Sequence, residues 1–335
     1  MENLVNSSPL ILVLVFLVIG FAFLMKGADF FVEGSSSIAK RLKVPPIIIG
    51  LTIVAMGTSL PETAVSVTAS LVNNNELAVS NVVGSNIFNL MVVVGVCSIL
   101  TPILVQKETI KRDIPFSMSC AFLLLGLGIL AVGDKSGMTL GHLDGMILLG
   151  FFAGYIVAMI QSAMKARAAG KNVEIEGIEE LEEEIGILSW PKSILFIVGG
   201  ALVIAFGGDL TVDAASRIAI DLGMSQTLVG LTIVSIGTSL PELVTSVVAA
   251  RKNEVDMAVG NAVGSNIFNI LMVLGIASAI NPVALIRENI IDIVILIVFS
   301  LIVWIYAATK RKISRKEGIS MVCMYLIYAG YIIWR

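Results

Sequence analysis

Long apolar runs divide this chain, and its polar residues gather in the short segments between them. A helix needs about 20 mostly apolar residues to cross a bilayer, and no run alternates like the strands of a membrane barrel. The pattern therefore predicts an all-α, polytopic membrane protein with ten transmembrane helices. The predicted spans are residues 9–32, 45–71, 76–101, 113–132, 142–164, 190–210, 226–250, 256–280, 289–309 and 317–334.

Composition agrees with this pattern and excludes several classes of protein. Hydrophobic residues make up 57% of the 335 residues and charged residues only 14%, whereas soluble domains carry about 25% charged residues. The net charge of −3 provides no basic surface for nucleic acid. These values exclude a soluble enzyme, a disordered chain and a nucleic-acid binder, and they leave the lipid bilayer as the surroundings. No protein partner or cofactor is indicated.

The distribution of Lys and Arg predicts the orientation in a cell membrane. Ten spans put both termini on one side, and inside loops are enriched in positive residues. With the termini outside, 17 of the 22 Lys and Arg residues lie inside, four lie outside and Lys26 lies within the first span. We therefore expect outside termini and a cytoplasmic loop at 165–189. Its seven Glu residues between Glu174 and Glu184 are typical of a solvated linker, or alternatively of a weak cation sensor.

Two sequence motifs occur twice at an offset of 180 residues. Residues 50–62 (GLTIVAMGTSLPE) and 230–242 (GLTIVSIGTSLPE) agree at 11 of 13 positions, and GSNIFN occurs at 84–89 and 264–269. The chain therefore divides into a first repeat (1–164), the acidic linker (165–189) and a second repeat (190–335). Five spans per repeat is an odd number, so the repeats have inverted topology. This architecture is common in secondary transporters, whose sites lie between the repeats.

Each copy of the first motif places a carboxylate inside an apolar span, at Glu62 and at Glu242. An ionisable residue at this depth is costly and indicates a functional site. Pro61 and Pro241 break their helices because proline has no N–H for the carbonyl four residues earlier. The break would expose the hydroxyls of Thr58, Ser59, Thr238 and Ser239 and free carbonyls near Ala55 and Ser235.

The second motif adds further neutral oxygens. Ser85 and Asn89 are four residues apart and share a helical face, as do Ser265 and Asn269. The combined set of carboxylates, hydroxyls, amides and carbonyls contains no sulfur or imidazole. Such a set suits hard cations such as calcium and sodium rather than zinc or copper.

At these residues the chain resembles the cation/calcium exchanger superfamily, and specifically the short prokaryotic sodium/calcium exchangers. The resemblance rests on GTSLPE at 57–62 and 237–242 and on GSNIFN at 84–89 and 264–269. It implies exchange of cytoplasmic calcium for external sodium. It also implies a calcium site at Glu62, Glu242, Thr58 and Thr238, with Asn89 and Asn269 lining the centre. The implied flanking sodium ligands are Ser59, Ser85, Ser239, Ser265 and the carbonyls of Ala55 and Ser235.

Other functions are weaker interpretations of the same residues. A membrane aspartyl protease needs two Asp, and a serine protease needs a nearby His, so we expect no enzyme. A cation channel is less consistent with inverted repeats and broken helices than an antiporter. A calcium/proton antiporter stays open, although the histidine-bearing motifs of that branch are absent. Some relatives, including potassium-dependent ones, carry a carboxylate at the position of Asn269, so we expect no potassium requirement.

Overall fold

The computed structural model describes residues 2–71, 75–130, 138–171, 187–224, 233 and 235–334. The helices are α1 (Glu2–Asn6), α2 (Leu10–Leu42), α3 (Pro46–Ile49), α4 (Ala55–Thr58), α5 (Leu60–Leu71), α6 (Asn75–Phe88), α7 (Val94–Leu100), α8 (Ile114–Leu130), α9 (His142–Lys171), α11 (Trp190–Asp221), α13 (Ser235–Gly237), α14 (Leu240–Arg251), α15 (Val255–Phe268), α16 (Leu274–Ile280), α17 (Arg287–Ala308) and α18 (Arg315–Trp334). The π-helical turns are η1 (Gly50–Val54), η2 (Asn89–Val93), η3 (Thr109–Asp113) and η5 (Asn269–Val273). The strands are β1 (Ile103–Leu104), β2 (Thr139–Leu140), β3 (Val283–Ala284) and β4 (Lys312–Ile313).

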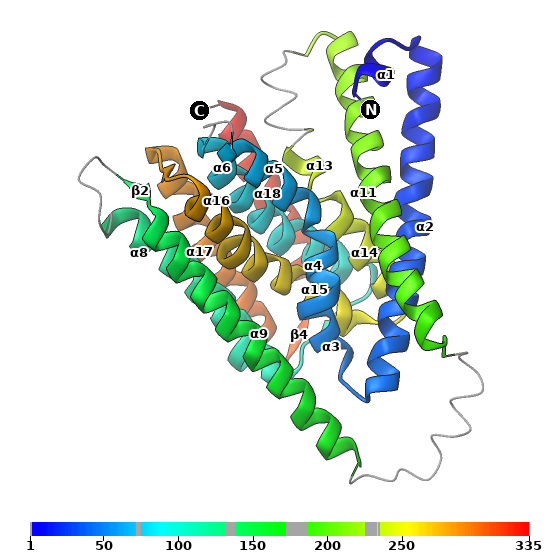
Figure 1. Ribbon diagram of the computed structural model, residues 1–335, viewed down its shortest axis with the longest axis vertical. Coiled ribbons are helices and arrows are strands. Elements are labelled where there is room, and N and C mark those ends of the chain that lie inside the picture. The colour runs from blue at the N-terminus through cyan, green and yellow to red at the C-terminus, as the bar shows by residue number, and fades with distance from the viewer. Residues whose placement is uncertain are drawn as a thin grey trace.

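The helices confirm the all-helical membrane class. Within the described residues, eight helices are long and apolar enough to cross a bilayer, and one bent pair, Pro46–Thr58 with Leu60–Leu71, provides a ninth span. The predicted span 226–250 lies partly outside the described residues, which include its residues 233 and 235–250 with α13 and most of α14. Figure 1 places both termini at one end of the long helices, opposite the end of α9 and the start of α11.

Two helices extend well past the spans predicted for them. The run 9–32 continues to Leu42 in α2, and the run 190–210 continues to Asp221 in α11. The middle of the α2 extension is buried against protein, from Gly34 to Ala39. There the hydroxyl of Ser36 donates to Glu254, and Ser37 accepts the backbone N–H of Leu188. Hydropathy alone misplaced these ends because polar side chains with protein partners prolong a helix beyond its lipid-facing segment.

Helices α2 and α11 pack closely along their length and form one side of the molecule (Figure 1). Glycines permit this approach. A Cβ added at Gly20 would lie 2.9 Å from the backbone nitrogen of Thr211, and one at Gly207 would lie 2.8 Å from the carbonyl oxygen of Gly20. The corresponding contacts at Gly27 and Gly200 are equally short. Close backbone packing of this kind is a principal source of helix association in membranes.

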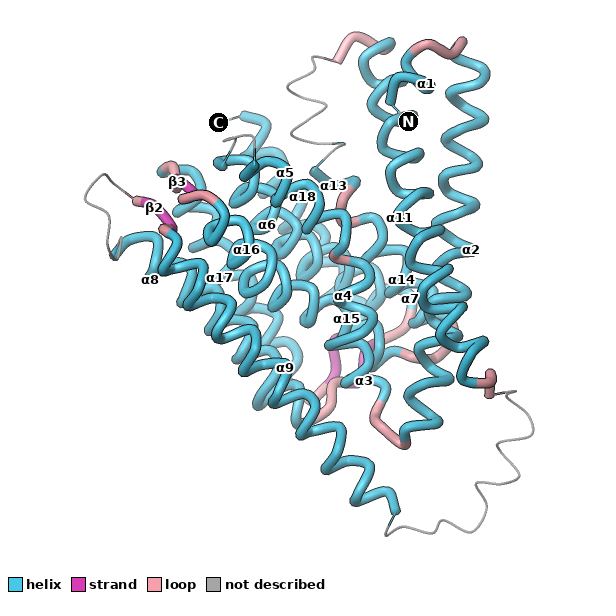
Figure 2. The backbone as a smooth tube through the Cα atoms, viewed as in Figure 1, coloured by secondary structure: helices cyan, strands magenta, loops and turns pink. Residues whose placement is uncertain are grey.

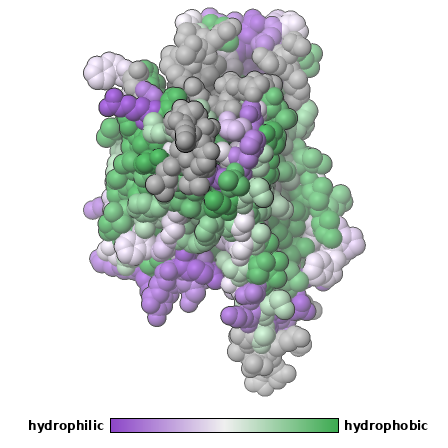
Figure 3. Space-filling model, turned by 60° about the vertical axis from the view of Figure 1, so that its left-hand side comes forward, coloured by the Kyte–Doolittle hydropathy of each residue, from purple (hydrophilic) through white to green (hydrophobic). Residues whose placement is uncertain are grey.

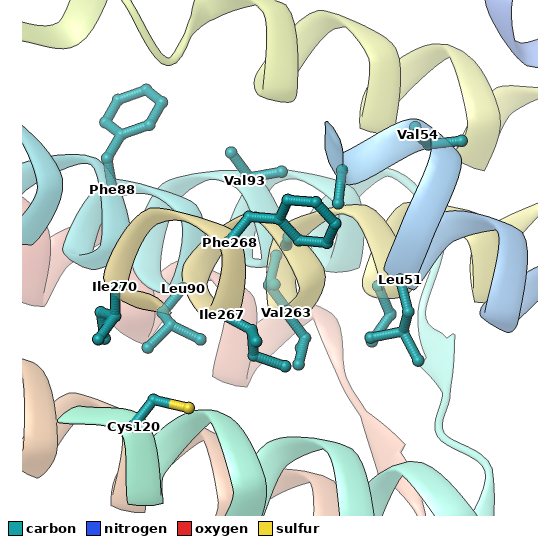
Figure 4. Packing of buried hydrophobic residues seen from close by; sticks show 14 of the residues in the cluster. Leu51, Val54, Phe88, Leu90, Val93, Cys120, Val263, Ile267, Phe268 and Ile270 are labelled. Carbon is teal, nitrogen blue, oxygen red and sulfur yellow. The ribbon is translucent and has the colours of Figure 1, made fainter. Parts of the chain in front are cut away.

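Helix α15 lies at the centre of the fold, and every residue from Met257 to Phe268 is buried. Figure 4 shows Val263, Ile267 and Phe268 packed among apolar side chains of the first repeat. Gly264 brings α15 against the first repeat, because a Cβ there would lie only 2.8 Å from the Cα of Leu51. The two repeats therefore share one core, and this contact positions the second motif against the first.

Short antiparallel ladders connect the repeats. Ile103 of β1 pairs with Ile313 of β4, and Leu140 of β2 pairs with Val283 of β3. Strands β1 and β3 are equivalent under the 180-residue offset, and each pairs with a strand of the other repeat. The ladders therefore reflect the same internal symmetry as the sequence motifs.

The outer surface suits a lipid environment. Apolar colour dominates the middle of the visible face in Figure 3, and polar colour gathers towards its ends. Large apolar side chains are exposed on the molecule, among them Ile11, Leu202 and Ile327, which are 79%, 65% and 74% exposed. In Figure 2 the described loops lie mostly at the ends of the helices. A broad exposed apolar belt is expected where the solvent is hydrocarbon.

Candidate cation-binding site

Two broken helices position the paired carboxylates. In the first repeat, α4 ends at Thr58 and α5 begins at Leu60, and the two halves of the span are bent by 48°. Pro61 lies in the first turn of α5, where its missing N–H costs no helical hydrogen bond. Glu62 follows it, and Glu242 occupies the equivalent place in α14. Both carboxylates are 0% exposed.

Each carboxylate accepts a hydrogen bond from the opposite repeat. The hydroxyl of Ser59 donates to Glu242 Oε1 at 3.1 Å, and that of Ser239 donates to Glu62 Oε1 at 3.3 Å. Ser265 donates to the same Glu242 oxygen at 3.3 Å. Two negative charges held in one buried cluster would also repel each other. Predicted residues of both motifs and both repeats therefore meet in one buried cluster.

The asparagines of the second motif also cross between the repeats. Asn89 donates its side-chain amide to Asn266 Oδ1 at 3.2 Å, and Asn269 donates to Asn86 Oδ1 at 3.1 Å. Asn89 and Asn269 each begin a π-helical turn, η2 and η5. Such turns interrupt regular α-helices and frequently occur at functional sites.

Several oxygens of this cluster lack a partner among the described residues. All belong to side chains that are 0% exposed. They are Glu62 Oε2, Ser85 Oγ, Asn89 Oδ1, Glu242 Oε2 and Asn269 Oδ1. Buried polar atoms are normally satisfied, because leaving one unpaired costs free energy. A group of acceptor oxygens without donors, two of them on carboxylates, is the arrangement that a bound cation satisfies.

The threonines of the first motif are held by asparagines that the sequence analysis did not single out. Thr58 donates to Asn261 Oδ1 at 3.0 Å, and Thr238 donates to Asn81 Oδ1 at 3.3 Å. In turn, Asn261 donates to Ser246 at 2.9 Å, and Asn81 donates to Ser66 at 3.1 Å. All these pairs obey the 180-residue offset, so a residue-by-residue search at this offset would have found them.

The two remaining predicted ligands are the backbone carbonyls of Ala55 and Ser235. The carbonyl of Ala55 is not free as expected, because it accepts the backbone N–H of Ser59 at 3.1 Å. Ser59 lies at the break itself, and its N–H still bonds to the carbonyl four residues earlier, as in a helix. In the second copy, the N–H of Ser239 bonds instead to Ile236. The carbonyl of Ser235, the other predicted carbonyl ligand, stays a prediction.

The fold and the buried oxygen cluster define an inverted-repeat membrane transporter for cations. A protein-family model described as sodium/calcium exchanger protein matches residues 12–161 and 192–334, once for each repeat. The chain belongs to the sodium/calcium exchanger family. This is a family of ion transporters and not of enzymes.

Named relatives and solved structures agree over nearly the whole chain. The sodium/calcium exchanger MaX1 of Methanosarcina acetivorans is 32% identical, over 93% of this chain and 96% of that protein. The putative antiporter CaxA of Alkalimonas amylolytica is 38% identical, over 94% and 96%. The inner membrane protein YrbG of Escherichia coli is 32% identical, over 95% and 94%. The sodium-calcium exchanger NCX_Mj, in crystals soaked with Na+ and Sr2+, superimposes with a TM-score of 0.80 at 31% identity, over 96% of this chain and 98% of that chain.

Proposed function

We propose that the protein is an antiporter that exchanges calcium for sodium by alternating access. The supporting observation is that Glu62 and Glu242, and likewise Asn89 and Asn269, each carry a buried side-chain oxygen without a partner among the described residues. Two carboxylates neutralise one calcium ion, which lowers the free energy of holding it among apolar helices. Calcium accepts six to eight oxygen ligands. The neutral oxygens of Ser85, Asn89 and Asn269 complete such a shell without adding charge.

Sodium as counter-ion fits the same oxygens. Sodium also binds hydroxyls and carbonyls, and Ser59, Ser239 and Ser265 already lie against the carboxylates. Sodium in flanking positions would withdraw these hydroxyls from the glutamates and compete with calcium for carboxylate charge. Such competition couples the two ions. NCX_Mj, named a sodium-calcium exchanger, supports this choice at 31% identity.

A cavity borders both helix breaks. It has a volume of about 400 Å³ and lies between α5, α11, α13 and α14, with Pro61, Thr238 and Pro241 in its wall. Asp209 and Asp213 of α11 line the same cavity and supply negative charge, which raises the local concentration of cations. We infer that ions enter past α11 and reach Glu62 and Glu242 beside the helix breaks.

We further propose that the protein lies in the cell membrane with both termini outside and the 165–189 segment in the cytoplasm. The bias of Lys and Arg supports this orientation, as does the position of both termini at one end of the helices (Figure 1). A relative named as an inner membrane protein supports the location. Calcium would then leave the cytoplasm as sodium enters.

Calcium-45 uptake into proteoliposomes tests this function. Purified protein is reconstituted, and sodium, potassium or proton gradients are imposed one at a time. An outward sodium gradient should drive calcium uptake with the pH gradient collapsed. Uptake that follows only the pH gradient would identify a calcium/proton antiporter. Calcium flux that needs no counter-ion would identify a channel.

A further inference from the structure

Asn86 and Asn266 lie outside the set of predicted ligands, yet they interlock across the pseudo-two-fold axis. The side-chain amide of Asn86 donates to the backbone carbonyl of Asn266 at 3.1 Å, and the amide of Asn266 donates to the carbonyl of Asn86 at 3.1 Å. Both side chains are at most 1% exposed. A carbonyl oxygen only accepts, so the end of each side chain that faces it must be the NH₂ group.

This constraint passes to the next pair of asparagines. With its NH₂ committed to a carbonyl, Asn86 presents only its oxygen to Asn269, and Asn266 presents only its oxygen to Asn89. Asn269 and Asn89 must therefore donate from their own NH₂ groups, at 3.1 and 3.2 Å. A flipped amide at Asn269 or Asn89 would set oxygen against oxygen. The orientation of an amide is decided by its partners in this way.

The oxygens of Asn89 and Asn269 therefore point away from this chain of bonds. Both atoms are buried and have no partner in the described part of the protein. Without such partners, an asparagine could also rest with its NH₂ group turned toward the site and would have to flip before its oxygen could bind a cation. The NH₂ end carries partial positive charge and repels the ion.

We propose that Asn86 and Asn266 are positioning residues that lock the amide oxygens of Asn269 and Asn89 toward the transported cation. The proposal rests on the cation site of the proposed function and adds how two neutral ligands are oriented there. The coupling is crossed: Asn86 acts through Asn269, and Asn266 acts through Asn89. Partners behind a metal ligand commonly change metal affinity by about 10- to 100-fold when they are removed.

Double-mutant cycles on calcium uptake test the crossed coupling. Asn86→Ala should raise the KM for calcium about tenfold. In an Asn269→Ala background the same change should have little further effect, whereas in an Asn89→Ala background the tenfold effect should persist. Asn266→Ala should show the reverse preference.

Asn281→Ala is the matched control. Asn281 also bridges the repeats, through a side-chain bond to the carbonyl of Ser70 at 3.2 Å, but it belongs to neither asparagine chain. Its replacement should leave the KM for calcium unchanged. Equal effects of Asn86→Ala in both backgrounds would overturn the proposal, as would a lower melting temperature with an unchanged KM.

Thermal stabilisation of the purified protein by calcium or sodium chloride separates this proposal from the proposed function. If the wild type transports another cation instead of calcium, the same cycles are measured with that ion. The crossed pattern then still supports the locking role, although the proposed function fails. If no such cation stabilises the wild-type protein against unfolding and none is transported by it, both proposals are overturned.

Discussion

The substitution Glu62→Gln tests the site with almost no change in shape. Gln keeps an oxygen that can accept the bond from Ser239, which is 3.3 Å from Glu62 Oε1. It converts the other, unpartnered carboxylate oxygen into an NH₂ group and removes one negative charge. The variant therefore presents a donor where the cation requires an acceptor.

The expected loss of calcium binding is large. Two unit charges about 4 Å apart interact by about 4 kcal/mol at an effective dielectric constant of about 20. A divalent ion doubles this to about 8 kcal/mol, and desolvation of the carboxylate offsets part of it. If about half remains, calcium affinity falls roughly a thousandfold, since each 1.4 kcal/mol is a factor of ten.

Calcium-45 uptake and thermal unfolding of Glu62→Gln are measured beside Glu288→Gln, an exposed control on α17. The site variant should lose uptake. Its ion-free form should melt at a temperature equal to or above that of the wild type, because Glu62 and Glu242 repel each other when both are charged. The control should change neither value. Near-normal calcium uptake by a folded Glu62→Gln protein would refute the reasoning.

Three further predictions concern orientation, ion dependence and packing. A membrane-impermeant thiol reagent should label a cysteine at position 7 (Ser7→Cys) in intact cells and miss one at position 177 (Gly177→Cys); the reverse pattern would contradict outside termini. Sodium-driven calcium flux should be similar with potassium or choline as the background cation, because Asn269 adds no third charge at the site; a saturable need for potassium would show otherwise. Gly207→Ala should lower the free energy of unfolding by about 1–3 kcal/mol, and with it the melting temperature. The reason is that the added Cβ would lie 2.8 Å from backbone atoms of α2. Gly150→Ala, where a Cβ meets nothing within 4 Å, is the control and should not destabilise; equal melting temperatures would refute the packing argument.

The sequence predicted those features of the site that depend on local chemistry. Pro61 requires a break in its helix, and the 180-residue offset requires an equivalent break before Glu242. The intramembrane placement of the two carboxylates follows from hydropathy. These local signals were sufficient to predict the class of fold and to single out the two glutamates, which the structure buries in one hydrogen-bonded cluster.

Contacts that depend on three-dimensional packing were beyond the sequence pattern. No spacing shows that Ser59 donates to Glu242 rather than to Glu62, because that bond depends on how the repeats cross at α15. The role of Asn86 likewise depends on a main-chain carbonyl 180 residues away. The length of α2 was underestimated for a similar reason, since its polar end is stabilised by partners such as Glu254.

Anomalous diffraction from crystals soaked in strontium tests the central claim most directly, because strontium substitutes for calcium and scatters strongly. One principal peak is expected between Glu62 and Glu242, at direct-ligand distance from an oxygen of each carboxylate, where calcium would lie at about 2.3–2.6 Å. In Glu62→Gln crystals this peak should be lost. A principal peak elsewhere, with no cation density between the two glutamates, would contradict the account.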